Sequence, residues 1–166
     1  GIKYGNESLI ISQEANLHWH MVTALLTLGY NYLGMGDFQQ GIDCLMRGIE
    51  QAKEIGALRL VSIALGMLGN YYQALNLLEE AETVHLEGLK IEGEIGTYWF
   101  LPRLKADLAI DRLRLGDLGV GPDLEEALEG AQLRDQLAHA IRCLEGLAEL
   151  THVQGDYRSE EHTSEL

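Results

Sequence analysis

The chain repeats itself every 40 residues, and this periodicity constrains its fold more than any other feature. A shift of 40 residues aligns positions 23–56 with positions 63–96 without a gap. Among the identical pairs are Gly29 with Gly69, Tyr32 with Tyr72, and Gly48 with Gly88. Repeats of roughly 20 to 50 residues are typical of solenoids, in which each unit packs on its neighbours. We therefore expect one elongated array of stacked units.

Within each unit the apolar residues recur at steps of three and four, which is the period of an amphipathic helix. Only 2 of the 166 residues are proline, so long uninterrupted helices are permitted. The pattern predicts first helices near residues 17–35, 57–75, 98–115 and 137–154. It predicts second helices near residues 38–55, 78–95 and 123–135, with a partial one near 7–15. The predicted fold class is therefore all-α, built from antiparallel helix pairs.

Gly-Asp pairs recur between the predicted helices, at Gly36-Asp37, Gly116-Asp117 and Gly155-Asp156. Glycine is free to adopt positive φ at a helix end, and Asp can cap the helix that follows. Asn16 can end a helix in the same way. Asn76-Leu77 replaces the Gly-Asp pair in the second unit, which predicts a shifted or continuous helix junction. The irregular segment 119–123 predicts a longer third turn and a shortened helix after it.

The spacing of these residues resembles the tetratricopeptide repeat, on the strength of Leu28-Gly29, Tyr32, Gly36-Asp37-Phe38, Gly41, Leu45 and Gly48. The resemblance implies a right-handed α-α superhelix, and small residues such as Gly41 and Gly48 where helices cross closely. It also implies a non-enzymatic module that binds protein or peptide segments. The implied layout is a repeat domain over 1–157, with a partial repeat 1–16, repeats 17–56, 57–96 and 97–136, and a partial repeat 137–157.

The 40-residue unit, with Glu-Ile-Gly at 54–56 and 94–96, resembles one subgroup of these arrays. Such arrays form the C-terminal arms of large bacterial signalling ATPases, including maltose-regulator-like transcription activators and ATPase-linked adenylate/guanylate cyclases. The chain starts at Gly1 without a methionine, so we expect a fragment whose neighbouring domains are among its partners. The resemblance implies a regulatory arm. The alternative is a sensor that binds a small effector in its concave groove and controls an attached ATPase or cyclase.

The last nine residues, 158–166, match the in-frame translation of a widely used sequencing adapter. The repeat needs a small residue at position 160, where Glu160 stands instead. We therefore expect a disordered tail that takes no part in the fold, the alternative being a genuine polar tail.

The formal net charge of −14 argues against direct binding to nucleic acid or to an anionic membrane. It favours a protein partner of basic or mixed charge. Cys44 and Cys143 lie within apolar helical patterns and far apart in sequence. They predict two buried free thiols rather than a disulfide or a zinc ribbon, and such thiols suit a reducing cytoplasm.

No motif predicts a catalytic residue, a metal site or a cofactor. In His18-Trp19-His20 the two histidines point about 200° apart on a helix, so they suit a metal poorly. We expect Trp19 to be packed between partly exposed histidines. The first helices of a tetratricopeptide superhelix line its concave face. Carried over by register, that groove comprises Tyr30, Leu33, Asn70, Gln73, Arg103, Ile110 and Arg114. An exposed aromatic, an amide and guanidiniums could hold an extended peptide or its carboxylates.

Overall fold

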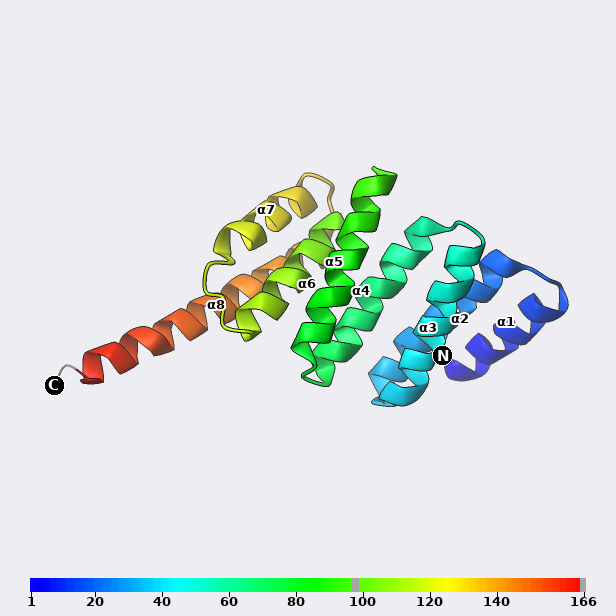
Figure 1. Cartoon of the computed structure of the whole chain (residues 1–166), viewed down its shortest axis with the longest axis horizontal. Helices are drawn as coiled ribbons and strands as arrows, with labels where there is room; N and C mark the ends of the chain where they lie inside the picture. Colours follow the sequence, from blue (N-terminus) through cyan, green and yellow to red (C-terminus); the bar gives the residue numbers. More distant parts are fainter. Residues whose placement is uncertain (97–98, 165–166) are drawn as a thin grey trace. The chain divides into compact units, whose positions relative to one another are not determined.

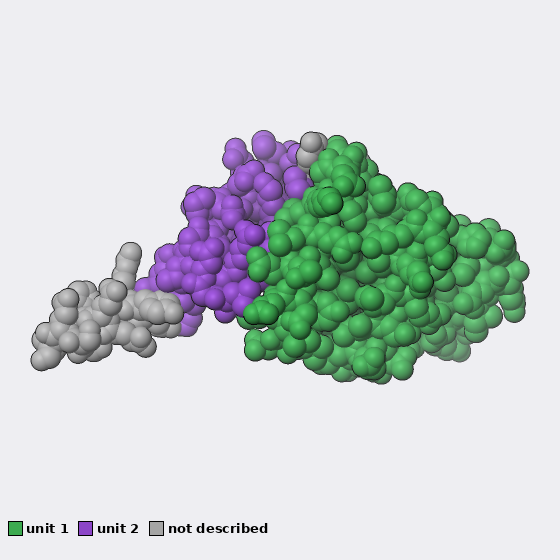
Figure 2. Space-filling model, in the orientation of Figure 1, with its two compact units in different colours: residues 1–100 green, residues 101–166 purple. Residues whose placement is uncertain are grey.

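The computed structural model describes the backbone of residues 1–96 and 99–164, with side chains up to residue 155. The chain forms two compact units, residues 1–100 and residues 101–166 (Figure 2). The first unit contains α1 (Ile2–Glu14), α2 (His18–Met35), α3 (Phe38–Glu54), α4 (Leu58–Ala74) and α5 (Leu78–Ile95). The second contains α6 (Leu101–Arg114), α7 (Gly121–Gln132) and α8 (Leu137–Ser164). Consecutive helices within a unit lie side by side (Figure 1). The described residues contain no strand, which confirms the all-α prediction.

A residue in the left-handed conformation follows each of the first seven helices. These residues are Asn16, Gly36, Gly56, Asn76, Gly96, Gly116 and Asp135, with φ between 53° and 103°. A left-handed residue after a helix turns the chain while its N–H satisfies a carbonyl of the last turn. The first six stand at intervals of 20 residues and the seventh follows after 19, so each helix with its turn occupies half of the 40-residue repeat.

The second helix junction is not shifted or continuous, contrary to the sequence prediction. Asn76 has φ 58° and ends the turn after α4, much as Gly36 with φ 74° does after α2. Asparagine tolerates this conformation because its short polar side chain can hydrogen-bond locally. Asp37 accepts a hydrogen bond from the backbone N–H of Gln40 at 3.3 Å, which confirms its predicted capping role.

The predicted turn at Gly155-Asp156 is absent, because α8 continues through it to Ser164. An existing helix propagates at one hydrogen bond per residue, so a Gly-Asp pair alone does not force it to end. The backbone is thus helical over residues 158–164, where the sequence predicted a disordered tail. The side chains there lie outside the described residues, and the adapter origin stays a prediction.

The remaining boundaries differ by a few residues. Helix α1 begins at Ile2, five residues before its predicted start at position 7. The predicted start of a helix at residue 98 lies outside the described residues, and α6 begins at Leu101. The junction between α6 and α7 is long and α7 has only 12 residues, as the irregular segment 119–123 predicts. The repeat boundaries themselves stay predictions.

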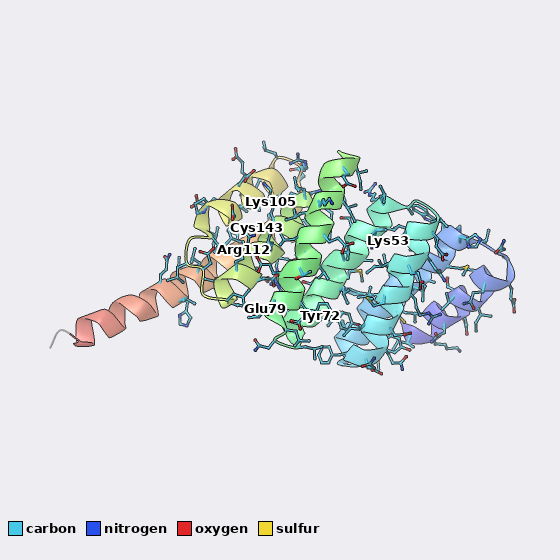
Figure 3. All side chains as sticks on the ribbon, in the orientation of Figure 1. Lys53, Tyr72, Glu79, Lys105, Arg112 and Cys143 are labelled. Carbon is cyan, nitrogen blue, oxygen red and sulfur yellow. The ribbon has the colours of Figure 1, made fainter. Side chains whose placement is uncertain are left out.

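Each unit has its own core. In the first unit, α2, α3 and α4 enclose Leu26, Leu45 and Leu68, with Tyr71 fully buried. In the second unit, apolar residues of α6, α7 and α8 pack around Cys143, which Figure 3 labels. Both Cys44 and Cys143 are buried free thiols, as the sequence predicts. None of the helices in residues 1–96 and 99–164 combines the length and the apolar character that crossing a membrane requires.

The close helix crossing in the first unit depends on Gly41. A Cβ atom at this position would lie 1.7 Å from the hydroxyl oxygen of Tyr71. Tyr71 cannot retreat easily, since its ring is 0% exposed and stands edge-on to Phe38 with 6.0 Å between ring centroids. The absence of a side chain at Gly41 therefore makes the space in which Tyr71 packs.

Replacing Gly41 by alanine should lower the free energy of unfolding by about 1 to 3 kcal/mol, which is typical of overpacking a core. Gly34→Ala is the matched control, because a Cβ atom there would meet no atom within 4 Å. The control should gain up to about 1 kcal/mol from the higher helix propensity of alanine. Urea denaturation followed by tryptophan fluorescence tests both variants, since Trp19 and Trp99 lie in the first unit. Equal effects of the two substitutions would contradict the packing account.

Candidate partner-binding surface

The first helices of the repeats, α2, α4 and α6, carry the seven groove residues that the sequence predicts. Tyr30 on α2 and Asn70 on α4 occupy the same place in successive repeats. Tyr30 is 68% exposed, an unusual amount for an aromatic side chain, and Asn70 is half-buried. Helices α2 and α4 contact each other, so the first unit presents the two side chains from neighbouring first helices.

Threonines precede Tyr30 along the same helix. The Thr27 hydroxyl donates to the carbonyl oxygen of Thr23 at 2.8 Å, and the Asn31 amide donates to the carbonyl oxygen of Thr27 at 2.7 Å. These bonds hold short polar side chains against the helix backbone. The surface next to Tyr30 is therefore low and polar, which leaves the phenol ring as its most prominent group.

Leu33 and Gln73, the next pair in register, are less accessible. Both are half-buried, and Leu33 packs against the core shared by α2, α3 and α4. Ile110 on α6 is 0% exposed and belongs to the core of the second unit. An isoleucine without accessible surface does not contact a ligand in this conformation, so Ile110 supports the fold here.

Arg103 lies within a network of charges in the second unit. Its Nε donates to Asp107 at 2.6 Å, and Nε of Arg142, on α8, donates to the other oxygen of the same carboxylate at 2.6 Å. The Asp107 side chain is 0% exposed, whereas those of Arg103 and Arg142 are 26% and 17% exposed. A buried carboxylate needs such charge-assisted bonds. Asp107 thus joins α6 to α8.

Arg114 lies one turn beyond the end of this network. Its guanidinium donates two hydrogen bonds to Glu149 of α8, at 2.7 and 2.9 Å. These bonds raise the pKa of Arg114 and, from the other side, lower the pKa of Glu149. Arg103 and Arg114, which the sequence predicts to hold a ligand's carboxylates, are thus engaged by carboxylates of their own unit.

The pH dependence of the Arg114–Glu149 pair follows from its sign. The folded-state pKa of Glu149 lies below its unfolded value, so its stabilisation is present at neutral pH and is lost as pH falls through the folded-state pKa. At neutral pH, Glu149→Gln should lower stability by about 1 kcal/mol or less, because the pair is partly exposed. The difference between wild type and variant should shrink in acid. Urea denaturation at a series of pH values measures it, and a constant difference would refute the assignment.

Sequence reasoning missed Asp107, Arg142 and Glu149. The spacing of Arg103 and Asp107 was a usable signal, since residues four apart meet on one helix face. Arg142 and Glu149 stand 35 residues beyond their partners, and no local pattern links them.

The His18-Trp19-His20 cluster is exposed. Trp19 is 51% exposed and does not pack as the sequence predicted, because it lies at the start of α2 with neighbouring positions also exposed. Within the described part of the chain, no group of three or more His, Cys, Asp or Glu side chains could hold a metal ion.

The two buried thiols should be unreactive in the folded protein. Burial raises the pKa of Cys143 to about 11, and burial also raises the pKa of Cys44. Both effects disfavour the reactive thiolate. Neither thiol should react promptly with Ellman's reagent at pH 8 in native buffer, and both should react in denaturant. Prompt labelling of either in native buffer would contradict the packing around it.

The hollows found in the described residues are small and open. They measure about 230 Å³ between α1 and α2, 310 Å³ between α6 and α7, and 240 Å³ between α7 and α8. Sites for drug-sized ligands typically measure about 300 to 1,000 Å³ and enclose most of the ligand. Lys105 and Glu126 form an ion pair of 2.7 Å in the wall of the largest hollow.

No protein-family model matches the chain, and no curated protein matches its sequence. Solved structures do match. BtubC (BKLC) from P. vanneervenii superposes with a TM-score of 0.78 at 19% identity, over 92% of this chain and 65% of that one. The apo form of RapI gives 0.77 at 17% identity, over 96% of this chain and 62% of RapI.

A third match is the signal transduction ATPase with numerous domains from Pyrococcus horikoshii, described as having a tetratricopeptide repeat sensor. It gives a TM-score of 0.70 at 20% identity, over 99% of this chain and 28% of that protein. The chain therefore spans less than two thirds of the length of each of these three structures. At such identities the likeness concerns the fold, and the chain has the fold of a tetratricopeptide-like helical repeat array.

Proposed function

We propose that this chain is a non-catalytic module that binds protein or peptide segments on the surface of its first helices. The exposed Tyr30 carries the proposal, together with Asn70 at the same place in the next repeat. Tyrosines are enriched among the residues that dominate binding energy at protein interfaces, because they combine a large apolar area with a polar group. The net charge of −14 favours a partner of basic or mixed charge over nucleic acid.

The module would serve as the regulatory arm of a larger bacterial signalling protein. The likeness to an ATPase with a tetratricopeptide repeat sensor supports this role, as does the share of that protein that the chain covers, 28%. The buried free thiols of Cys44 and Cys143 support a cytoplasmic location. The arm would then act by holding a protein segment while attached domains carry out the chemistry.

The alternative role is an effector sensor that binds a small ligand and controls an attached ATPase or nucleotide cyclase. The hollows of 230 to 310 Å³ lie at or below the lower limit for such ligands. The exposed Tyr30 also suits an extended ligand better than an enclosed one. These observations favour the peptide-binding role.

A display library of random peptides tests the proposal, with the wild-type chain as bait. Selected peptides should carry net positive or mixed charge. They should lose at least about tenfold in affinity for Tyr30→Ala/Asn70→Ala, since each 1.4 kcal/mol of lost contact energy is tenfold in affinity. Met46→Ala is a matched control, because Met46 is 51% exposed on α3, a second helix. Failure to select any peptide, or selected peptides that bind the double variant equally well, would refute the proposal.

A further inference from the structure

The two ends of the chain are complementary within the repeat. Helix α1 ends at a left-handed Asn16, just as the second helix α3 ends at Gly56, so α1 is a second helix without a first helix before it. Helix α8 follows the left-handed Asp135, as the first helix α4 follows Gly56, and no second helix follows it in the described residues. Each end therefore presents the helix that the other lacks.

An apolar stripe runs along α8. It comprises Leu137, Ile141 and Leu144, which are 73%, 49% and 52% exposed, followed by the exposed Ala148. The spacing of four, three and four residues places all of them on one helix face. In the repeat register, Ile141, Leu144 and Ala148 take the places of the following residues of α2: Val22, Leu25 and Gly29.

Those three positions are buried on α2. Val22 and Leu25 are both 0% exposed, and a Cβ atom at Gly29 would lie 2.8 Å from Leu45 of α3. The face that α2 uses to pack on its second helix is therefore the face that α8 leaves uncovered.

The hollow of about 230 Å³ at the other end of the chain lies between α1 and α2 and is lined by Gly1, Tyr4, Gly5, Ser8, Thr23, Ala24 and Thr27. Tyr4 is 71% exposed. One repeat later, Gly48 takes the place of Ser8, and a Cβ atom there would lie 2.7 Å from Leu26 of α2. Helix α2 thus covers the corresponding surface in the next repeat, where it also contacts α4. The uncovered hollow has the lining that receives a first helix elsewhere in the chain.

We propose that the chain associates head to tail with a second copy of itself, with α8 of one copy lying in the α1–α2 hollow of the next. The interface repeats the packing of α2 on α3, with Ile141 and Leu144 buried against Tyr4 and Ser8. Because the two surfaces differ, the contact is heterologous, and a third copy can bind to the free end of a pair. This association does not depend on the proposed peptide binding.

Sedimentation velocity on the full chain tests the proposal, because two substitutions block opposite ends. The average mass of the wild type should rise with protein concentration past that of a dimer. Ile141→Glu and Tyr4→Glu should each weaken association at least about tenfold, since a carboxylate would be buried without a partner. Both positions are exposed in the single copy, so circular dichroism should show an unchanged fold.

The decisive measurement is the equimolar mixture of the two variants. Ile141→Glu keeps an intact hollow and Tyr4→Glu keeps an intact α8 stripe, so the mixture should form dimers that cannot grow. Met46→Glu, on exposed α3, should associate like the wild type. A monomeric wild type would overturn the proposal. So would a mixture that stays monomeric, a Tyr4→Glu variant that still dimerises through α8 alone, or a loss of association in Met46→Glu.

Discussion

Replacing Tyr71 by alanine should lower the free energy of unfolding of the first unit by about 3 to 5 kcal/mol, as removal of a fully buried aromatic side chain does. The ring is 0% exposed and packs edge-on against Phe38, with an angle of 86° between the ring planes. Its hydroxyl donates to the carbonyl oxygen of Gly29. Burial raises the pKa of this phenol to about 12, so it stays protonated and remains a donor. Urea denaturation followed by tryptophan fluorescence reports on this unit.

Two control substitutions separate the contributions of Tyr71. Tyr71→Phe keeps the ring and removes the hydrogen bond, and it should lower stability by about 1 kcal/mol. Tyr30→Ala removes a tyrosine that is 68% exposed, and its effect should stay within about 0.5 kcal/mol. If Tyr71→Ala and Tyr30→Ala had equal effects, Tyr71 would not be a core residue.

Replacing Asp107 by alanine should lower the free energy of unfolding of the second unit by about 3 kcal/mol. This is the lower end of the range for removing one partner of a buried ion pair. The carboxylate is 0% exposed and receives Arg103 and Arg142 at 2.6 Å each, whereas both arginines keep some contact with water. Without Asp107, two guanidiniums would face each other without the negative charge between them. Hydrogen exchange of the α6–α8 amides, followed by mass spectrometry, measures the change.

Glu145→Ala is the matched control for Asp107. Glu145 also accepts from Arg142, at 3.4 Å, but its side chain is 59% exposed. An exposed pair of this kind contributes at most about 1 kcal/mol and is screened by salt. The Asp107 effect should persist at high salt, whereas the Glu145 effect should vanish. An Asp107 effect that disappears at high salt would show that the pair is solvated.

The candidate surface was only partly predictable. Register placed Tyr30 on a first helix, and its exposure agrees with a binding role because nothing packs over that face of α2 in the first unit. The same register placed Ile110 on the predicted groove, yet the structure buries it. Periodicity identifies which residues are equivalent between repeats, but the helices that cover them differ from one repeat to the next. Arg103 and Arg114 were chosen for their charge, and carboxylates distant in sequence decide what that charge is bound to.

The sequence by itself determined the period, the helical pairs and most of the turns. These depend on local chemistry: apolar spacing makes the helices, and Gly36 or Asn16 can adopt the left-handed conformation that ends them. Asn76 shows how general that rule is, since it turns the chain in place of glycine. Tertiary structure alone decided that Gly41 leaves room for Tyr71, that Asp107 joins Arg103 to Arg142, and that the stripe on α8 stays uncovered. Each of these depends on what lies opposite a residue in space, and such neighbours stand 30 or more residues away in the chain.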